Sequence, residues 1–518
     1  MNKNIVRILA LLLAALMFTV CFVGCQDNPD RGNEGGDVTD APADDGTQEG
    51  SDSETQAPEQ SLEDILGFEI PNLDKSFNIL YQKGIEATVT DIIAESFDGD
   101  EVAIEVYERN ILIEEKFGVT LNFVDSIDNW NTRAEDKKFI ESAVQAGTND
   151  YDLVAGSNVT MATMMYSGLF YNLCDVESID FDHSWWMPDT VETYGIGNRV
   201  YGLLGDAMHS YYSQLNLIAV NKTLADSFGV EAAHGDFYQL AYDGKWTLDT
   251  YLTIGAAYGQ DNGDGVMKAT DDVFGSVVIN VPSRNFLYSL GHEIITLNET
   301  EDGVVLPTAL DEKTVTSYEK LYNAFPQTVG TGVSPNCISI STVETACKAF
   351  SENRILMMTS YFSYLGSEDI RNMSGEYMMM PMPKYDENQE DYITPFGTTA
   401  SMLLIPLTAI NEEQSGMVME YMGYVGEKDI VPVYIGQTLK LKYANDDKVM
   451  EMVQYIIDRA AFTLTQATIW NCEVGGMFRN MYCFGSMNAV GSPNVSSFYG
   501  SYRRAWQKQL DNIISGIL

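Results

Sequence analysis

The sequence predicts an α/β protein whose folded body has two lobes, and two observations support this. The chain has 518 residues with 45% hydrophobic content, so its body is too long for one core of ordinary size. Its first elements follow the order strand, helix, strand, helix, strand, which is typical of a parallel sheet covered by helices.

These first elements are predicted from periodicity and from glycine stops. The strands alternate or are short and apolar, and each helix has an apolar face and ends at a glycine, Gly118 or Gly147. In chain order the segments are 77–81 (strand), 100–117 (helix), 119–124 (strand), 134–146 (helix) and 151–154 (strand). Ligands of such sheets lie at the carboxyl ends of strands, so the loop after Val154 is a candidate wall of a site.

Later elements are less regular. Thr247 is placed to cap a helix that starts after Trp246. Strand-like runs cover 273–280 and 401–405, and a helical pattern covers 502–514.

The N-terminus is typical of an exported protein. Lys3 and Arg7 precede an apolar run from Ile8 to Val23, which is too short and wrongly flanked for a lasting membrane helix. Residues 1–24 are therefore expected to be a signal peptide. No later apolar run in the sequence is long enough to span a bilayer.

Phe22-Val23-Gly24-Cys25 resembles a bacterial lipobox, which implies that Cys25 is diacylated and becomes the new N-terminus. Phe22 stands where leucine is usual, and a plain cleaved signal is the alternative. From Gln26 to Asp64 there are thirteen acidic residues, one basic residue and no aromatic residue. Such a stretch cannot bury enough apolar surface to offset its ordering entropy. Residues 25–65 are thus expected to be a lipidated cysteine and a disordered acidic tether on the extracellular face of the cell membrane.

Charge and cysteine content exclude some classes of partner. The net charge of −45 disfavours nucleic acid and anionic lipid, because both need clustered Lys and Arg. The same charge repels acidic ligands at long range, although a local arginine such as Arg284 counters this. After Cys25 the cysteines are Cys174, Cys337, Cys347, Cys472 and Cys483. Cys337 with Cys347 and Cys472 with Cys483 are conceivable bridges, and no zinc-type Cys/His spacing occurs.

Several blocks, in order along the body, resemble the extracellular solute-binding proteins of bacterial ABC importers, specifically a carbohydrate-type, family 1-like branch. Asp243-Gly244-Lys245-Trp246-Thr247 is the sharpest of them. The other blocks are Ala146-Gly147, Tyr151-Asp152-Leu153-Val154, Trp185-Trp186, Arg199-Val200-Tyr201-Gly202, Ala219-Val220-Asn221-Lys222, Pro381-Met382-Pro383-Lys384-Tyr385-Asp386 and Ile405-Pro406.

This resemblance implies a two-lobed, periplasmic-binding-protein-like (Venus-flytrap) fold over residues 66–518, with lobes that are discontinuous in sequence and joined by two or three hinge-crossing segments. It implies a monomeric, non-enzymatic lipoprotein that captures a sugar or oligosaccharide and delivers it to the permease subunits of an ABC transporter.

A sugar presents hydroxyls and apolar C–H faces, so its receptor needs flat rings beside polar side chains. Trp246 and Trp506 are expected to be packing residues instead, since most buried rings serve packing. The candidate ligand-binding residues are Trp130, Trp185, Trp186, Tyr211, Tyr212, Tyr361, Phe362, Trp470 and Asn471.

Residues 260–265 resemble a calcium loop, with Asn262, Asp264 and Asp271 as its weak candidate ligands. Gln260 stands where the first carboxylate belongs, so a polar glycine-rich turn is the favoured interpretation and no cofactor is expected.

Two rival functions stay open at the level of sequence. One is a surface glycan-binding or sensory lipoprotein with the same fold. The other is an exported glycoside hydrolase, which needs two facing carboxylates. With 75 acidic residues, carboxylate pairs occur by chance. A peptide or polyamine is the alternative solute.

Overall fold

A computed structural model describes residues 60–94, 100–126, 135–297, 303–326, 334–440, 447–472, 478, 480–484 and 488–517. The signal segment, Cys25, most of the acidic stretch and Trp130 lie outside these residues. Residues Gln60–Leu518 form one compact unit. No helix in the described part of the chain is long and apolar enough to cross a membrane.

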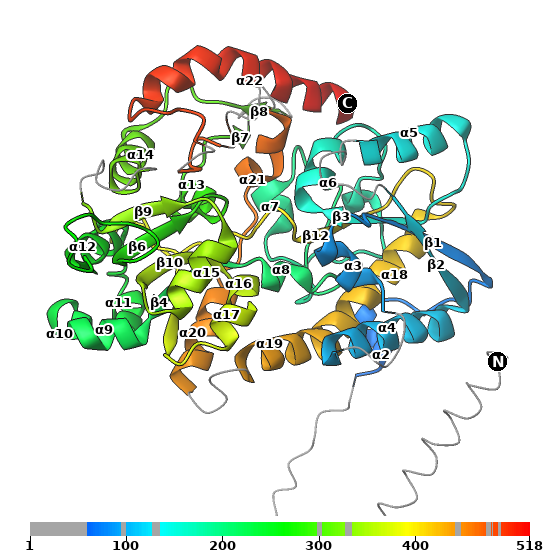
Figure 1. The fold of residues 1–518 in the computed structure, drawn as a ribbon. Helices are drawn as coiled ribbons and strands as arrows, with labels where there is room; N and C mark the ends of the chain where they lie inside the picture. Colours follow the sequence, from blue (N-terminus) through cyan, green and yellow to red (C-terminus); the bar gives the residue numbers. More distant parts are fainter. Residues whose placement is uncertain are drawn as a thin grey trace, which may run out of the picture. The chain divides into compact units, whose positions relative to one another are not determined.

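The first lobe is built on a four-stranded sheet in the order β12-β3-β1-β2 (Figure 1). β1 (Lys75–Tyr81) pairs in parallel with both β2 (Val119–Asp125) and β3 (Leu153–Ser157). β12 (Ser401–Leu404) joins antiparallel to β3 from a distant part of the chain. The predicted parallel arrangement of the first three strands is confirmed.

Local signals define the helices of this lobe. Asp100 caps α4 (Glu101–Phe117) by accepting a hydrogen bond from the amide of Ala103 at 2.9 Å. Gly118 ends it in the left-handed region, with φ of 60°, where a side chain is disfavoured. The other first-lobe helices are α2 (Leu62–Leu66), α3 (Glu86–Ile92), α5 (Asp136–Ala146), α6 (Asn158–Met164), α7 (Thr190–Tyr194) and α18 (Glu412–Val425).

The ordered body begins slightly before the expected residue 66. Ser61 and Asp64 form a capping box at the start of α2, in which each side chain accepts a hydrogen bond from the other residue's backbone amide. Leu66 of this short helix is buried. Leu62 and Ile65 are partly buried against the same core, so apolar contacts and a cap hold residues that the composition assigned to the tether.

The second lobe is built on a six-stranded sheet in the order β11-β4-β10-β6-β5, with β9 also paired to β6. β10 is parallel to β6 and antiparallel to β4. The strands are β4 (Asn216–Asn221), β5 (Gly259–Gln260), β6 (Val273–Ile279), β9 (Cys337–Ile340), β10 (Ile355–Tyr361) and β11 (Tyr377–Pro381). This sheet mixes both strand directions.

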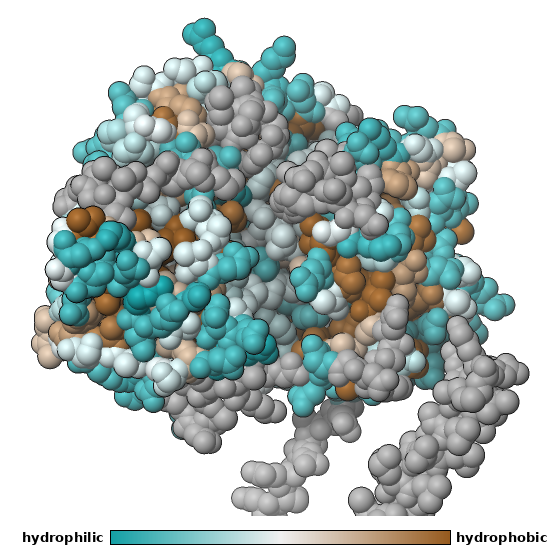
Figure 2. Space-filling model, viewed as in Figure 1, coloured by the Kyte–Doolittle hydropathy of each residue, from teal (hydrophilic) through white to brown (hydrophobic). Residues whose placement is uncertain are grey.

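Helices and one hairpin complete the body. Hydrophilic side chains cover the second lobe over α15, α16 and α17 (Figure 2). The elements are α8 (Ser210–Ser213), α9 (Lys222–Phe228), α10 (Val230–His234), α11 (Phe237–Tyr242), α12 (Leu248–Ala257), α13 (Phe286–Ser289), β7 (Thr296–Leu297), β8 (Val304–Val305), α14 (Glu312–Ala324), α15 (Val343–Ser351), α16 (Phe362–Leu365), α17 (Glu368–Arg371), α19 (Val431–Lys440), α20 (Asp447–Ile457), α21 (Leu464–Thr468) and α22 (Val495–Ile517).

Trp246 is a packing anchor, as predicted. Its side chain is fully buried, and its Nε1 donates to the carbonyl oxygen of Pro381 at 2.9 Å. Leu248, in the next turn, donates its amide to the carbonyl oxygen of Lys384 at 2.7 Å. Two of the sequence blocks that carry the family resemblance are therefore in direct contact. Trp506 is also fully buried, and stacks on Phe478.

The five described cysteines are all free thiols, so neither conceivable bridge forms. The buried apolar side chains of the two sheets join in one continuous cluster. The two lobes are therefore packed against each other.

Candidate functional site

Two chain segments cross between the lobes side by side. The first leads into β4 and the second leads from β11 to β12, and Leu215 of the first forms an antiparallel bridge with Phe396 of the second. The amide of Asn216 donates to the carbonyl oxygen of Pro395 at 2.8 Å. The amide of Gly397 donates to the carbonyl oxygen of Gln214, also at 2.8 Å. These bonds hold the two segments together where a hinge is needed.

A helical segment is a further crossing. α18 packs on α4 of the first lobe, and α20 packs on β11 of the second. Between them the chain runs through a π-helical turn, Gly426–Ile430, directly into α19. The expectation of two or three crossing segments is met by these elements.

Gly397 is a point where both lobes and both extended crossings meet. Asn158, which follows β3, donates its Nδ2 to the carbonyl oxygen of Gly397 at 2.8 Å. A Cβ atom at Gly397 would lie 2.4 Å from Oε1 of Gln214 and 3.0 Å from Cζ of Tyr361. Glycine at this position therefore lets a polar side chain of the hinge and a ring of the second lobe come together.

The first lobe contributes a buried polar network at the carboxyl ends of β1 and β3. Nε2 of Gln82 donates to Oδ2 of Asp136 at 2.8 Å and to Oγ1 of Thr160 at 2.9 Å. Its Oε1 accepts from the amide and the hydroxyl of Ser157, at 3.0 and 2.7 Å. Parallel strands end at one edge of a sheet, so these groups gather on the ligand-binding edge expected for such sheets.

The second lobe contributes Tyr361, Asn285 and Arg284 at the carboxyl ends of β10 and β6. Nδ2 of Asn285 donates to the hydroxyl of Tyr361 at 3.4 Å. Burial raises the pKa of Tyr361, against an opposing effect of Arg284. The phenol therefore keeps its proton at neutral pH and is able to donate a hydrogen bond.

Trp470 and Asn471 connect the second-lobe residues to the first lobe. The guanidinium carbon of Arg284 lies 5.2 Å from the centre of the Trp470 ring, a cation–π distance. Nδ2 of Asn471 donates to the carbonyl oxygen of Ala162, in α6 of the first lobe, at 3.0 Å. Three of the predicted site residues, Tyr361, Trp470 and Asn471, therefore belong to one group.

We call this group the inter-lobe site. The group links the first-lobe network to the second-lobe residues through Gly397, which accepts a hydrogen bond from Asn158 and lies against Tyr361. Its members are Gln82, Asn158, Thr160, Gln214, Arg284, Asn285, Tyr361, Trp470 and Asn471.

Comparison with known proteins gives matches in structure only. No family model and no curated protein sequence matches the chain. The galacto-N-biose/lacto-N-biose I-binding protein of an ABC transporter from Bifidobacterium longum superposes with a TM-score of 0.52 at 11% identity, covering 86% of this chain and 98% of that one. A cyclo/maltodextrin-binding protein gives 0.50 at 11% identity, covering 86% and 97%. The GacH receptor of Streptomyces glaucescens gives 0.50 at 13% identity, covering 84% and 99%.

The chain has the fold of these two-lobed solute-binding proteins. The predicted fold class is thereby confirmed. The carboxyl ends of β1, β3, β6 and β10 lie toward the junction between the lobes, so segments far apart in sequence supply the inter-lobe site.

Tyr211 and Tyr212 lie in the first crossing segment, and their hydroxyls are used internally. Both donate to Oδ1 of Asp206, at 3.2 and 2.8 Å. The two rings are 4.0 Å apart. The structure places this pair in the hinge, with its polar groups already bonded to the protein.

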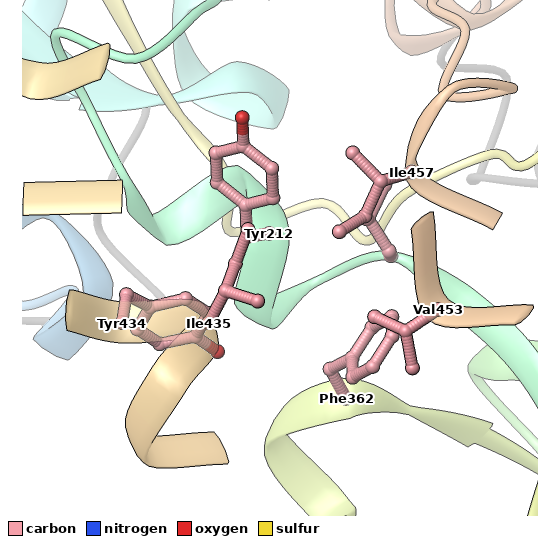
Figure 3. A pocket seen from close by; sticks show the side chains of 7 residues that line it. Tyr212, Phe362, Tyr434, Ile435, Val453 and Ile457 are labelled. Atoms are coloured by element: carbon pink, nitrogen blue, oxygen red, sulfur yellow. The ribbon is translucent and has the colours of Figure 1, made fainter. Parts of the chain in front are cut away.

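Phe362 and Tyr212 instead line a small apolar pocket with a volume of about 10 Å³. Leu215, Tyr434, Ile435, Val453 and Ile457 complete its wall. The hydroxyl of Tyr212 points away from the other labelled side chains (Figure 3). A sugar buries hydroxyls that need partners, so this pocket suits packing of the hinge against α19 and α20 rather than sugar binding.

Trp185 and Trp186 are buried in the first lobe, in contact with α18. Their Nε1 atoms donate to the two carboxylate oxygens of Glu420, each at 2.8 Å, and Nδ1 of His183 lies 2.8 Å from the same group. A Cβ atom at Gly423 would lie 2.1 Å from Cδ1 of Trp185. The contacts of both tryptophans are thus with the interior of their own lobe rather than with the inter-lobe site.

The loop that resembles a calcium site is held by its own hydrogen bonds. Oδ1 of Asn262 accepts from the amide of Asp264 at 3.0 Å, and the Asp264 carboxylate pairs with Nζ of Lys268. Asp271 is exposed. Among the described residues no group of three or more His, Cys, Asp and Glu side chains is placed to hold a metal ion. This geometry is that of a polar turn.

The sequence analysis missed the polar members of the site in the first lobe and the hinge. Gln82 and Asn158 directly follow β1 and β3, so the rule that ligands lie beyond strand ends indicates them once the strands are assigned. Thr160 lies one turn further. Gln214 and Asn285 carry no local signal, because only the crossing of the chain brings them to Tyr361.

Proposed function

We propose that this protein captures a sugar or short oligosaccharide outside the cell and delivers it to the permease subunits of an ABC transporter. The observation that carries the proposal is the inter-lobe site, where rings, amide side chains and one arginine meet at a junction crossed by hinge segments. The superposed proteins are described as binders of lacto-N-biose, maltotetraose and acarbose, which supports the same class of ligand here.

The chemistry of the site fits a sugar. Trp470 and Tyr361 offer flat faces for C–H groups, while Asn285, whose side-chain nitrogen donates to Tyr361, offers an amide donor and acceptor. Carbohydrate hydroxyls need such paired groups, because an unpartnered hydroxyl costs free energy on burial.

Delivery requires a state that the permease distinguishes from the empty receptor. A ligand held by both lobes favours their closed arrangement, and it does so only through its tighter binding to that arrangement. We expect low-micromolar affinity, on the order of −8 kcal/mol, which allows both capture and release.

A thermal-shift screen of the purified chain against neutral and acidic mono- and oligosaccharides tests the ligand class. A saccharide at about 100 times its Kd is expected to stabilise the folded protein by about 2.7 kcal/mol. Trp470→Ala should abolish that shift, because it removes a ring of the inter-lobe site. Trp185→Ala is the matched control, since its ring packs in the first lobe: the variant should lose stability but keep the ligand-induced shift.

Two results contradict the proposal. If no saccharide raises the melting temperature while a peptide or polyamine does, the ligand class is wrong. If the chain hydrolyses the oligosaccharide that it binds, it is a glycoside hydrolase.

A further inference from the structure

The strongest unexplained feature of the inter-lobe site is a buried cation, Arg284, that forms no ion pair with a carboxylate among the residues the structure describes. Arg284 is 5% exposed. Its contacts are Sγ of Cys483 and Oδ1 of Asn480, both at 3.4 Å, and the Trp470 ring. We propose that the bound solute supplies the missing charge: it is an oligosaccharide that carries a carboxylate, such as a uronic acid unit, and Arg284 binds that carboxylate.

This inference deepens the proposed function and rests on it. A buried charge is costly unless it is paired and hydrogen-bonded. The chain follows this rule elsewhere: the guanidinium of Arg109 donates to the carbonyl oxygens of Asp91 and Ala207, at 2.7 and 2.9 Å, next to the Asp91 carboxylate. Arg284 makes two hydrogen bonds of 3.4 Å, to Cys483 and Asn480, and a cation–π contact with Trp470, and among the described residues none of its partners is a carboxylate.

The geometry of the guanidinium suits an oxyanion such as a carboxylate. A guanidinium presents a planar fork of donors that matches two carboxylate oxygens. Nη1 of Arg284 forms no hydrogen bond with the described residues, so one arm of the fork is available. One cation balances one carboxylate, and the Trp470 ring and the Tyr361 hydroxyl lie beside it for the sugar ring that bears the acid.

The strong negative charge of the chain does not prevent the binding of an acidic sugar. Exposed charges are largely screened beyond about 8 Å at physiological ionic strength. A guanidinium in a site closed to water acts at short range and with little screening. The net charge of −45 therefore lowers the rate of encounter with an acidic sugar more than it lowers the affinity of the bound state.

Calorimetric titration of the full chain tests the inference with paired ligands. The probes are galacturonate and glucuronate oligosaccharides, their methyl esters, maltotriose, and a sulfated oligosaccharide. A uronate oligosaccharide is expected to bind, and its methyl ester to bind at least about 30-fold more weakly, because the ester keeps the shape and loses the charge.

Arg284→Gln is expected to weaken the uronate by at least about 30-fold. It should leave the melting temperature of the ligand-free protein unchanged or raise it, because it removes an unpaired buried charge. Arg284→Lys keeps the charge and loses the planar fork of donors, so it should also weaken binding of the uronate. This variant tests the inference if Arg284→Gln fails to fold. The control is Arg354→Gln, an arginine already paired with Glu352 at 2.7 Å, which should bind as the unaltered chain does.

Each other result overturns the inference. If neutral saccharides bind as tightly as uronates, sugar capture stands and the acidic ligand is wrong. If only the sulfated oligosaccharide binds, the anion that Arg284 recognises is a sulfate ester and not a carboxylate. If Arg284→Gln destabilises the ligand-free protein and leaves uronate affinity intact, Arg284 only packs against Trp470. If no saccharide binds at all, the proposed function fails as well.

Discussion

Asp206 is a buried carboxyl group that binds two neighbouring tyrosine hydroxyls in the hinge. Burial raises the pKa of Asp206 to about 7, although the hydrogen bonds from Tyr212 and Tyr211 act in the opposite direction and the charge of Glu427 adds to the rise. The ordinary value is 3.8, so the folded protein holds this proton more tightly than the unfolded chain does. Asp206 therefore makes the free energy of unfolding fall as pH rises from about 4 to about 7.

Asp206→Asn should remove this pH dependence. Asparagine keeps an acceptor for the two tyrosines and carries no charge, so the variant should be more stable than the unaltered chain at pH 8, by at most about 4 kcal/mol. The advantage should shrink as pH falls toward 4. Urea unfolding at pH 4.5, 6 and 8 measures it. The raised pKa of Asp206 is contradicted if the variant is less stable than the unaltered chain at pH 8, or if the difference in stability does not change with pH.

At the scale of elements, the two kinds of crossing approach each other most closely at the π-helical turn. A Cβ atom at Gly426 would lie 2.0 Å from the carbonyl oxygen of Asp206. Backbone atoms cannot yield as a flexible side chain does, so the absence of a side chain at this residue sets the distance between α18–α19 and the first crossing segment.

Gly426→Ala should therefore destabilise the protein by about 1–3 kcal/mol, the usual cost of overpacking. It should also weaken saccharide binding, because it pushes the crossing segments apart. The matched control is Gly500→Ala in α22, where a Cβ atom meets nothing within 4 Å and alanine should stabilise the helix by about 0.5–1 kcal/mol. Urea denaturation of both variants distinguishes them. Equal effects at the two glycines would show that helix propensity, rather than close approach, decides both.

At the scale of the whole molecule, we propose that a lipid on Cys25 holds the protein at the extracellular face of the membrane. The basis is the sequence Phe22-Val23-Gly24-Cys25 and the thirteen acidic residues that follow it up to Asp64.

Cys25→Ala should abolish incorporation of a clickable palmitate analogue in the producing cells, since the thiol is the acylation site. Cys21→Ala is the control, because this nearby cysteine precedes the expected cleavage point. It should still be labelled. Labelling of the Cys25 variant would refute the anchor and leave a plain cleaved signal.

Elements that depend on neighbours in sequence were predicted well. α4 starts after the Asp100 cap and ends at Gly118, and the helix that follows Trp246 starts at the Thr247 cap. Trp246 and Trp506 are packing residues as expected. The structure brings some of the predicted site residues together and separates others. Tyr361, Trp470 and Asn471 meet between the lobes, whereas Trp185 and Trp186 bond to Glu420 inside one lobe.

The sequence by itself determined the α/β class, the parallel order of the first three strands and the caps, because periodicity and cap residues act over a few residues. Only the tertiary structure decided which rings face the junction and which polar groups join them. Gln214, Arg284, Tyr361 and Gly397 are separated by long stretches of chain, and their contacts depend on how two sheets pack and where the chain crosses between them. A ring that packs in the core and a ring that binds a sugar have the same local sequence signal, and burial against a particular partner is what separates the two.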